Sequence, residues 1–355
     1  MMEDFSILHF VALALIFGSI SLQVVAFFKI LTLGSGETSE KVNDNHFLVQ
    51  YEPPDGLFPL EAGHLINGRL NFDDIAGEIV NLATKGVIKI TDTYYEIPLL
   101  PDIPDVVLTK LTEDLSLDEA QRKLLNLFFT WNKEVSLFQA SKKPRFRNYF
   151  RKKFKDLERY LDNKMIEEGL FDQKKYRQLN NSRALVGLSF FLMFFGLTIA
   201  GEDPPSLIVK GVAISFFLGI ITLLLSFARF WAFYTQKGLD ILRKLRGYQE
   251  FLEATESEKL QIYTSGEDVS SLFERHLPFA IALGVGSAWA EKFKNLVDLN
   301  LRWYSNTHKA RFSALDVTKC LQNIASGASQ LCTSKSGISG GSSGGGMGGG
   351  GGKSW

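Results

Sequence analysis

Three long apolar segments constrain the fold of this chain more than any other feature of its sequence. They run over Phe5–Phe28, Ala184–Ala200 and Leu207–Phe233. A helix rises about 1.5 Å per residue, so segments of these lengths match a hydrocarbon core of about 30 Å. Because lipid cannot satisfy backbone amide and carbonyl groups, such segments cross a bilayer as helices. The sequence therefore predicts a mainly α membrane protein with three transmembrane helices, the first of them a retained anchor.

The segment Gly201–Ser206 separates the second and third apolar segments and contains two acids and two prolines. These residues cannot continue a helix through lipid, so we expect a transmembrane helical hairpin. Basic residues flank both outer ends of this hairpin: Lys174, Lys175, Arg177, Arg183, Lys237, Arg243, Lys244 and Arg246. By the positive-inside rule they predict a multi-pass protein of the plasma (inner) membrane, with its N-terminus outside and its C-terminus cytoplasmic. Lys210 and Arg229 near the ends of the third segment fit snorkelling, with an ion pathway as the alternative.

The part of the chain between the first two spans has the helix and strand signals of a winged-helix unit. A helix over Pro59–Ile66 is followed by a second helix that Asn71 caps and Gly86 ends. Val87–Ile90 alternates as a strand, and we expect a turn at Asp92–Thr93 and a return strand over Tyr94–Ile97.

The same order of elements follows a second time. A capping box at Ser116 opens a helix, Val135–Phe138 has the pattern of a strand, and a long helix is expected over Pro144–Glu168. We therefore predict two winged-helix-like cytoplasmic units in tandem, of α+β type. The full predicted division is an anchor (1–34), a linker (35–47), the two units (48–112 and 113–180), the hairpin (181–236), a C-terminal cytoplasmic helical segment (237–332) and a disordered Gly/Ser-rich tail (333–355).

Charge argues against DNA as the partner of these units, although many winged helices bind it. Residues 35–140 hold eighteen acids and eight bases, and a duplex repels such a surface. The bases gather instead on the long helix and just before it, at Lys142, Lys143, Arg145, Arg147, Arg151, Lys152 and Lys153. Either this is the solvated face of a helix packed on a core, or it contacts anionic lipid headgroups.

The C-terminal segment begins with an amphipathic helix, Asp240–Glu258, which we expect to continue the third span into the cytoplasm. The apolar run that follows Pro278 is too short to span a bilayer. A buried helix over Pro278–Asp298, packed against the cytoplasmic units, is therefore predicted.

No pattern in the sequence indicates a catalytic residue, a metal site or a cofactor. Cys320 and Cys332 lack metal-ligand spacing, the histidines are scattered, and the Gly-x-Ser-x-Gly matches lie only in the glycine-rich tail. The leading hypothesis is a non-catalytic scaffold or signalling adaptor whose cytoplasmic units bind a protein partner. A component of an oligomeric transporter or channel, built as a homo-oligomer, is the alternative, and a membrane-bound enzyme without a recognisable motif is the third.

Two motif blocks resemble the YciQ-like predicted membrane proteins, a family of unknown function. The first block contains Tyr51, Pro53, Pro54 and Gly56, and the second contains Leu277, Pro278, Ala280, Leu283, Gly284 and Trp289. The resemblance implies a bacterial membrane protein but provides no catalytic residue. Family members usually carry an extracytoplasmic β-sandwich before the first anchor, and we expect this chain to lack it, whether or not the domain is encoded separately.

Overall fold

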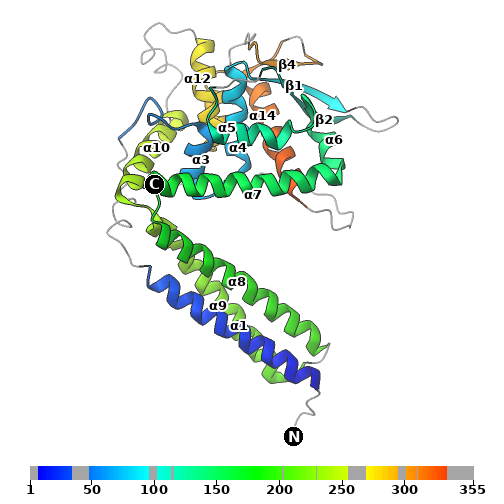
Figure 1. Ribbon diagram of the computed structural model, residues 1–355, viewed down its shortest axis with the longest axis vertical. Helices are drawn as coiled ribbons and strands as arrows, with labels where there is room; N and C mark the ends of the chain where they lie inside the picture. Colours follow the sequence, from blue (N-terminus) through cyan, green and yellow to red (C-terminus); the bar gives the residue numbers. More distant parts are fainter. Residues whose placement is uncertain are drawn as a thin grey trace.

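The computed structural model describes residues 7–33, 48–95, 102–112, 116–201, 204–228, 230–254, 269–294, 301–309 and 311–333. Two regions are evident in Figure 1: three long helices form a span bundle, and the remaining elements form a head domain, residues 48–172 and 230–333. The predicted linker and almost the whole predicted tail lie outside the described residues.

The span bundle contains α1 (Ile7–Leu31), α8 (Gln173–Ala200) and α9 (Ser206–Ala228). All three are long and apolar enough to cross a membrane. Large apolar side chains point outward, with Phe191 64% and Phe217 65% exposed, as expected of a surface that lipid covers. The start of α1 lies at the end of the bundle away from the head domain (Figure 1). The three predicted spans are therefore confirmed as helices that could cross a membrane.

The head domain is mostly helical with a small sheet. Its elements are α3 (Pro59–Asn67), α4 (Phe72–Thr84), β1 (Ile88–Tyr95), β2 (Ile103–Lys110), α5 (Glu119–Phe128), β3 (Glu134–Ser136), α6 (Leu137–Lys142), α7 (Pro144–Glu167), the 3₁₀ helix η1 (Phe230–Phe233), α10 (Gln236–Ala254), α12 (Val269–Ala282), α13 (Gly286–Glu291), β4 (Tyr304–Asn306) and α14 (Ala314–Cys332). One apolar core extends through these elements.

The sheet has the strand order β3-β2-β1-β4. β1 and β2 are antiparallel, with Ile90 opposite Leu108, while β4 joins β1 in parallel. Its strands thus come from both predicted winged-helix-like units and from the C-terminal segment. The winged-helix assignment and the unit boundaries stay predictions.

The predicted turn at Asp92–Thr93 is wrong, because both residues lie inside β1 and the chain returns only at β2. The carboxylate of Asp92 accepts hydrogen bonds from the Tyr304 hydroxyl at 3.0 Å and the Asn306 amide at 2.8 Å. A polar residue that usually marks a turn is satisfied here by the neighbouring strand β4, which sequence periodicity could not reveal.

Two further expectations need correction. α10 does not continue α9, since η1 intervenes and Tyr234 forms an isolated antiparallel bridge with Phe171. Within its described residues, which end at 294, the predicted helix Pro278–Asp298 is instead the end of α12 and the short α13, separated at Gly284, whose φ of +78° stops a helix. The expected packing of this segment is observed, because α12 lies close against α3 and α4.

Candidate functional site

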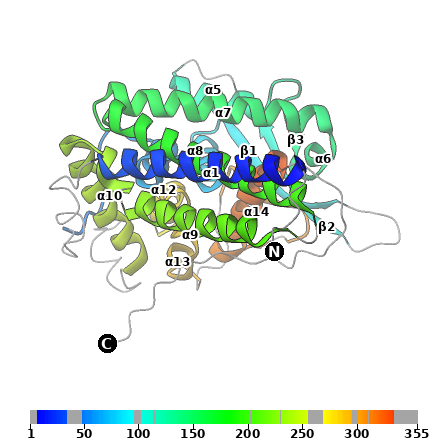
Figure 2. The ribbon, with the colours of Figure 1, turned by 90° about the horizontal axis from the view of Figure 1, so that it is seen from below.

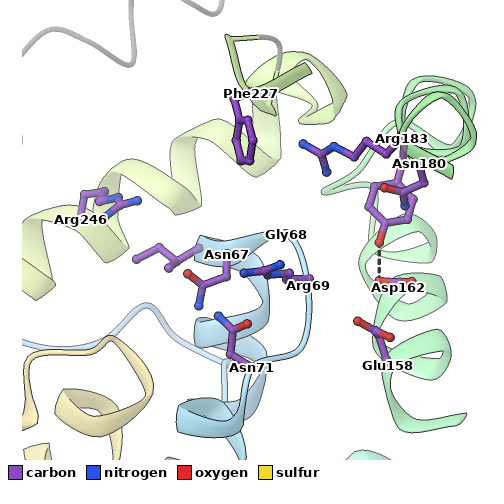
Figure 3. Close-up of a pocket in the computed structure, with 12 residues that line it drawn as sticks. Asn67, Gly68, Arg69, Asn71, Glu158, Asp162, Asn180, Arg183, Phe227 and Arg246 are labelled. Atoms are coloured by element: carbon purple, nitrogen blue, oxygen red, sulfur yellow. Dashed lines mark hydrogen bonds between the residues drawn. The ribbon is translucent and has the colours of Figure 1, made fainter. Parts of the chain in front are cut away.

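A cavity of about 770 Å³ lies where the head domain meets the span bundle. It is drawn in Figure 3, which shows side chains from α7, α8, α10 and the turn between α3 and α4 around one space. The residues that line it are mostly polar or charged: Ile66, Asn67, Gly68, Arg69, Asn71, Glu158, Asp162, Tyr176, Asn180, Arg183, Phe227 and Arg246.

The turn between α3 and α4 places Arg69 at the cavity. α3 ends at Gly68, which adopts a φ of +61°, a conformation that glycine reaches without steric cost. α4 begins immediately afterwards, where the Asn71 backbone N–H donates to Asp74 Oδ2 at 2.7 Å in a reciprocal cap. Arg69 is therefore fixed between two capped helices, with its side chain exposed.

The first turns of α8 supply a second wall. Tyr176, Asn180 and Arg183 recur at intervals of four and three residues, so they lie on one face of the helix. Arg183 donates to the Ser226 carbonyl of α9 at 3.4 Å, which directs its guanidinium across the bundle end.

Arg246 brings a third guanidinium from α10. It donates to Gln249 Oε1 at 2.9 Å, and burial lowers the pKa of Arg246. Three positive charges from separate elements thus approach one cavity.

Two carboxylates one turn apart on α7, Glu158 and Asp162, form the acidic wall. Asp162 Oδ1 accepts a 2.7 Å hydrogen bond from the Tyr176 hydroxyl. It also lies 3.0 Å from Nε2 of the fully buried His64, although that contact lacks hydrogen-bond alignment. Burial raises the pKa of Glu158, and the nearby charge of Asp162 adds to the effect. The cavity therefore offers donors and charges of both signs.

The two family-motif blocks pack beside each other on α10. The Tyr51 ring contacts Phe251 edge-on at 5.3 Å, and Phe251 lies 6.1 Å from Trp289 between ring centroids. Leu277, Ala280, Leu283 and Trp289 are buried, whereas Tyr51, Gly56 and Gly284 are exposed and Pro53, Pro54 and Pro278 complete the two blocks. None of these ten residues lines the cavity, and the buried ones pack in the core of the head domain.

The seven basic residues predicted to contact lipid also lie outside the cavity. Lys142, Lys143, Arg145 and Lys152 are exposed, while Arg147, Arg151 and Lys153 are half-buried. Arg151 donates to the Cys332 carbonyl at 3.2 Å, and Arg145 lies over the Trp131 ring. Contact with lipid therefore stays a prediction for the exposed members.

Sequence reasoning found Arg183 and Arg246 only as topology signals and missed Arg69, Glu158 and Asp162. These residues are far apart in sequence, and only the folded chain brings them together. The one local signal was Gly68, a helix-ending glycine directly before an arginine. Within the described residues, no group of three or more His, Cys, Asp or Glu side chains could hold a metal ion.

Comparison with known proteins identifies the family but no function. No curated protein and no solved structure matches this sequence. The model of the family described as "Predicted membrane protein (DUF2207) C-terminal domain" matches residues 48–293, which is most of the chain. This confirms the resemblance that the two motif blocks indicated. The chain belongs to this family of predicted membrane proteins.

Proposed function

We propose that this membrane protein is a non-catalytic scaffold or signalling adaptor, in which the spans fix the position of the head domain and the head domain binds a protein partner. The observation that carries the proposal is the junction between the two regions. A head domain on a loose tether would need no such junction, whereas an adaptor that transmits the state of its spans does.

Backbone and side-chain hydrogen bonds join the start of α8 to the segment after α9. The Asp172 backbone N–H donates to the Phe233 carbonyl at 2.7 Å, and the Thr235 hydroxyl donates to the Gly169 carbonyl at 2.6 Å. The Tyr234 hydroxyl, which is buried, donates to the Leu65 carbonyl of α3. The residues directly before α8 and those that follow α9 are thereby bonded to each other and to α3.

Close packing adds to these bonds. Gly238 of α10 lies so near the chain that a Cβ there would be 2.2 Å from the Leu170 carbonyl oxygen. Rings of Phe171, Phe233 and Tyr234 also contact one another at centroid distances of 4.5 to 5.2 Å. Such packing fixes the chain directly before α8 against the chain that follows α9.

The head domain and the hairpin tip lie on opposite sides of the membrane in this proposal. The head domain is cytoplasmic, and the N-terminus is outside, because basic residues gather at the head end of the bundle. α7 forms the face of the head domain toward the bundle (Figure 1), and in the view from below its axis lies alongside the axes of α1 and α8 in projection (Figure 2). Its core-facing side packs on α5 and α14, so its exposed lysines face the bilayer.

Site-specific photo-cross-linking in native membranes tests the scaffold. A photoreactive residue at exposed Leu111 or Leu315 of the head domain should cross-link the same partner protein, and one at lipid-facing Phe191 should not. Breaking the junction with Gly238→Val should reduce this cross-linking, provided that the circular dichroism of the purified variant stays native. Cross-links only between copies of this chain, strongest from Phe191, would instead favour the oligomeric transporter or channel.

Topology is tested by labelling with a membrane-impermeant maleimide in intact cells, after Cys320 and Cys332 are changed to Ser. Ser206→Cys at the start of α9 should react, whereas Lys174→Cys at the start of α8 should react only after lysis. The reverse pattern would contradict the proposed orientation.

A further inference from the structure

The junction cavity opens beside the apolar surface of the span bundle. Phe227, near the end of α9, is 70% exposed and lines the cavity together with charged residues of the head domain. In Figure 3 its ring lies on the side of the cavity opposite Asn71 and Glu158. Charged groups and a lipid-facing aromatic ring therefore border one space, at the level where a bilayer changes from headgroups to acyl chains.

We propose that this cavity binds the headgroup of a phospholipid that carries both a phosphate and a primary ammonium group. The phosphate lies between the guanidinium groups of Arg69 and Arg183, and the ammonium group lies at the carboxylate of Glu158. The acyl chains leave past Phe227 along α9.

Arginine is the side chain best suited to a phosphate, because its planar guanidinium donates paired hydrogen bonds to two oxygens. Figure 3 shows Arg69 and Arg183 reaching into the same space from different elements. Within the part of the chain that the structure describes, Arg69 makes no hydrogen bond or ion pair. The charges of Arg69 and Arg183 repel each other, and an anion between them would relieve this repulsion.

The acidic wall selects among phosphate-bearing ligands. A ligand with only negative charge would be repelled by Glu158 and Asp162, both of which line the cavity. Asp162 accepts from the Tyr176 hydroxyl, and Glu158 accepts from the Leu70 backbone N–H. A carboxylate has further lone pairs, so Glu158 can also pair with an ammonium. The volume of about 770 Å³ lies within the usual range of ligand cavities and leaves space for a headgroup.

Native mass spectrometry of the full chain, released from detergent micelles, tests the proposal. The protein is incubated with phosphatidylethanolamine, phosphatidylglycerol or phosphatidylcholine of identical acyl chains. We expect phosphatidylethanolamine adducts to predominate on the wild type. Arg69→Gln should reduce them about tenfold, because it removes charge-assisted hydrogen bonds. Arg122→Gln, an exposed arginine on α5 outside the cavity, is the matched control and should leave them unchanged.

Glu158→Gln separates recognition of the ammonium from recognition of the phosphate. This variant should still bind phospholipid, but its preference for phosphatidylethanolamine over phosphatidylglycerol should disappear. Thermal unfolding temperatures are measured for the wild type and all variants. Equal values show that a loss of lipid adducts is not caused by unfolding of the variant. Adducts that survive Arg69→Gln, or that show no preference among the three lipids on the wild type, would overturn the proposal.

A second arm distinguishes a lipid from a free phosphate compound. Inorganic phosphate and phosphoethanolamine, each at millimolar concentration, are added to delipidated protein before mass analysis. The proposal expects neither to form a retained adduct that depends on Arg69, because the acyl chains are needed for tight binding. An Arg69-dependent adduct with either compound, in the absence of a phosphatidylethanolamine adduct, would show that the cavity binds a soluble ligand. It would overturn the proposal of a bound phospholipid.

Discussion

The span bundle and the head domain distribute polar and apolar side chains in opposite ways. In the bundle, phenylalanines face outward, while Ser19, Ser189 and Ser215 are fully buried. In the head domain the largest buried side chains are aromatic, led by Trp289. Each region turns toward its surroundings the groups that those surroundings can solvate. Buried hydroxyls in the bundle are satisfied by hydrogen bonds: those of Ser19 and Ser215 bond between helices, whereas that of Ser189 bonds to the Val186 carbonyl of its own helix.

The head domain also buries carboxylates, which the bundle does not. Glu78 of α4 is fully buried, and its carboxylate accepts from the Gln121 and Asn81 side-chain amides at 2.7 and 2.8 Å. Burial raises the pKa of Glu78 to about 7 despite these bonds. A charge inside the head domain is therefore sensitive to pH near neutrality.

The largest effect should come from emptying the head core. Trp289→Ala removes a side chain with no exposed surface that contacts Phe293 and His276, so it should destabilise the head domain by about 3–5 kcal/mol. Phe191→Ala, at a lipid-facing position, should change the free energy of unfolding far less. Denaturant unfolding of the detergent-solubilised protein, followed by circular dichroism, measures both. Similar losses for the two variants would contradict the opposite burial of the two regions.

The pH dependence of stability should follow Glu78. Its pKa in the folded state lies above the unfolded value, so the folded protein retains a proton that the unfolded chain releases. Stability from this group is full below about pH 4.5, falls as the pH rises towards 7 and is then constant. The total change should be about 3 kcal/mol.

Glu78→Gln should flatten this part of the profile, whatever it does to stability at a single pH. Burial also raises the pKa of Asp74 on the same helix. Stability of the variant should therefore still fall with rising pH, but less steeply than in the wild type. Unfolding temperatures of both proteins across pH 4 to 8 provide the measurement. An unchanged slope in the variant would show that Glu78 does not titrate in this range.

Within the bundle, Ser19 should be the hydroxyl that matters most. It donates to the Ser189 carbonyl at 2.9 Å and shares a 2.7 Å hydrogen bond with Ser215, so it links α1 to α8 and α9. Ser19→Ala should weaken the bundle by about 1 kcal/mol, the size expected of hydrogen bonds between membrane helices. Ser21→Ala, which loses only a bond to the Phe17 carbonyl on its own helix, is the control. Unfolding of both variants is measured in a denaturing detergent series. If Ser19→Ala and Ser21→Ala unfold equally, the hydrogen bonds of Ser19 do not hold the helices together.

Sequence alone identified the three spans, because lipid imposes a continuous apolar length that few other structures require. It also located α4 and α7 closely, where caps and periodicity agree with tertiary packing. It failed at Asp92, whose turn signal is overridden by a strand more than two hundred residues away, and at Tyr234, where a bridge to Phe171 ends the helical path. The cavity residues escaped for the same reason, since Arg69, Arg183 and Arg246 converge only through the junction.

The smallest expected effect concerns α7, whose exposed lysines should lie against anionic lipid. A spin label at Lys152→Cys should collide with a nickel-chelating lipid more often than one at Lys89→Cys of β1, on the side of the head domain away from the bundle (Figure 1). Changing Lys142, Lys143 and Arg145 to Ser should lower that collision rate in anionic nanodiscs, because each basic residue near the surface contributes about 1 kcal/mol. Neutral nanodiscs should show no such difference between the variants. Equal accessibility of the two labels in anionic lipid would mean that the basic face of α7 is exposed to water, and that the junction alone positions the head domain.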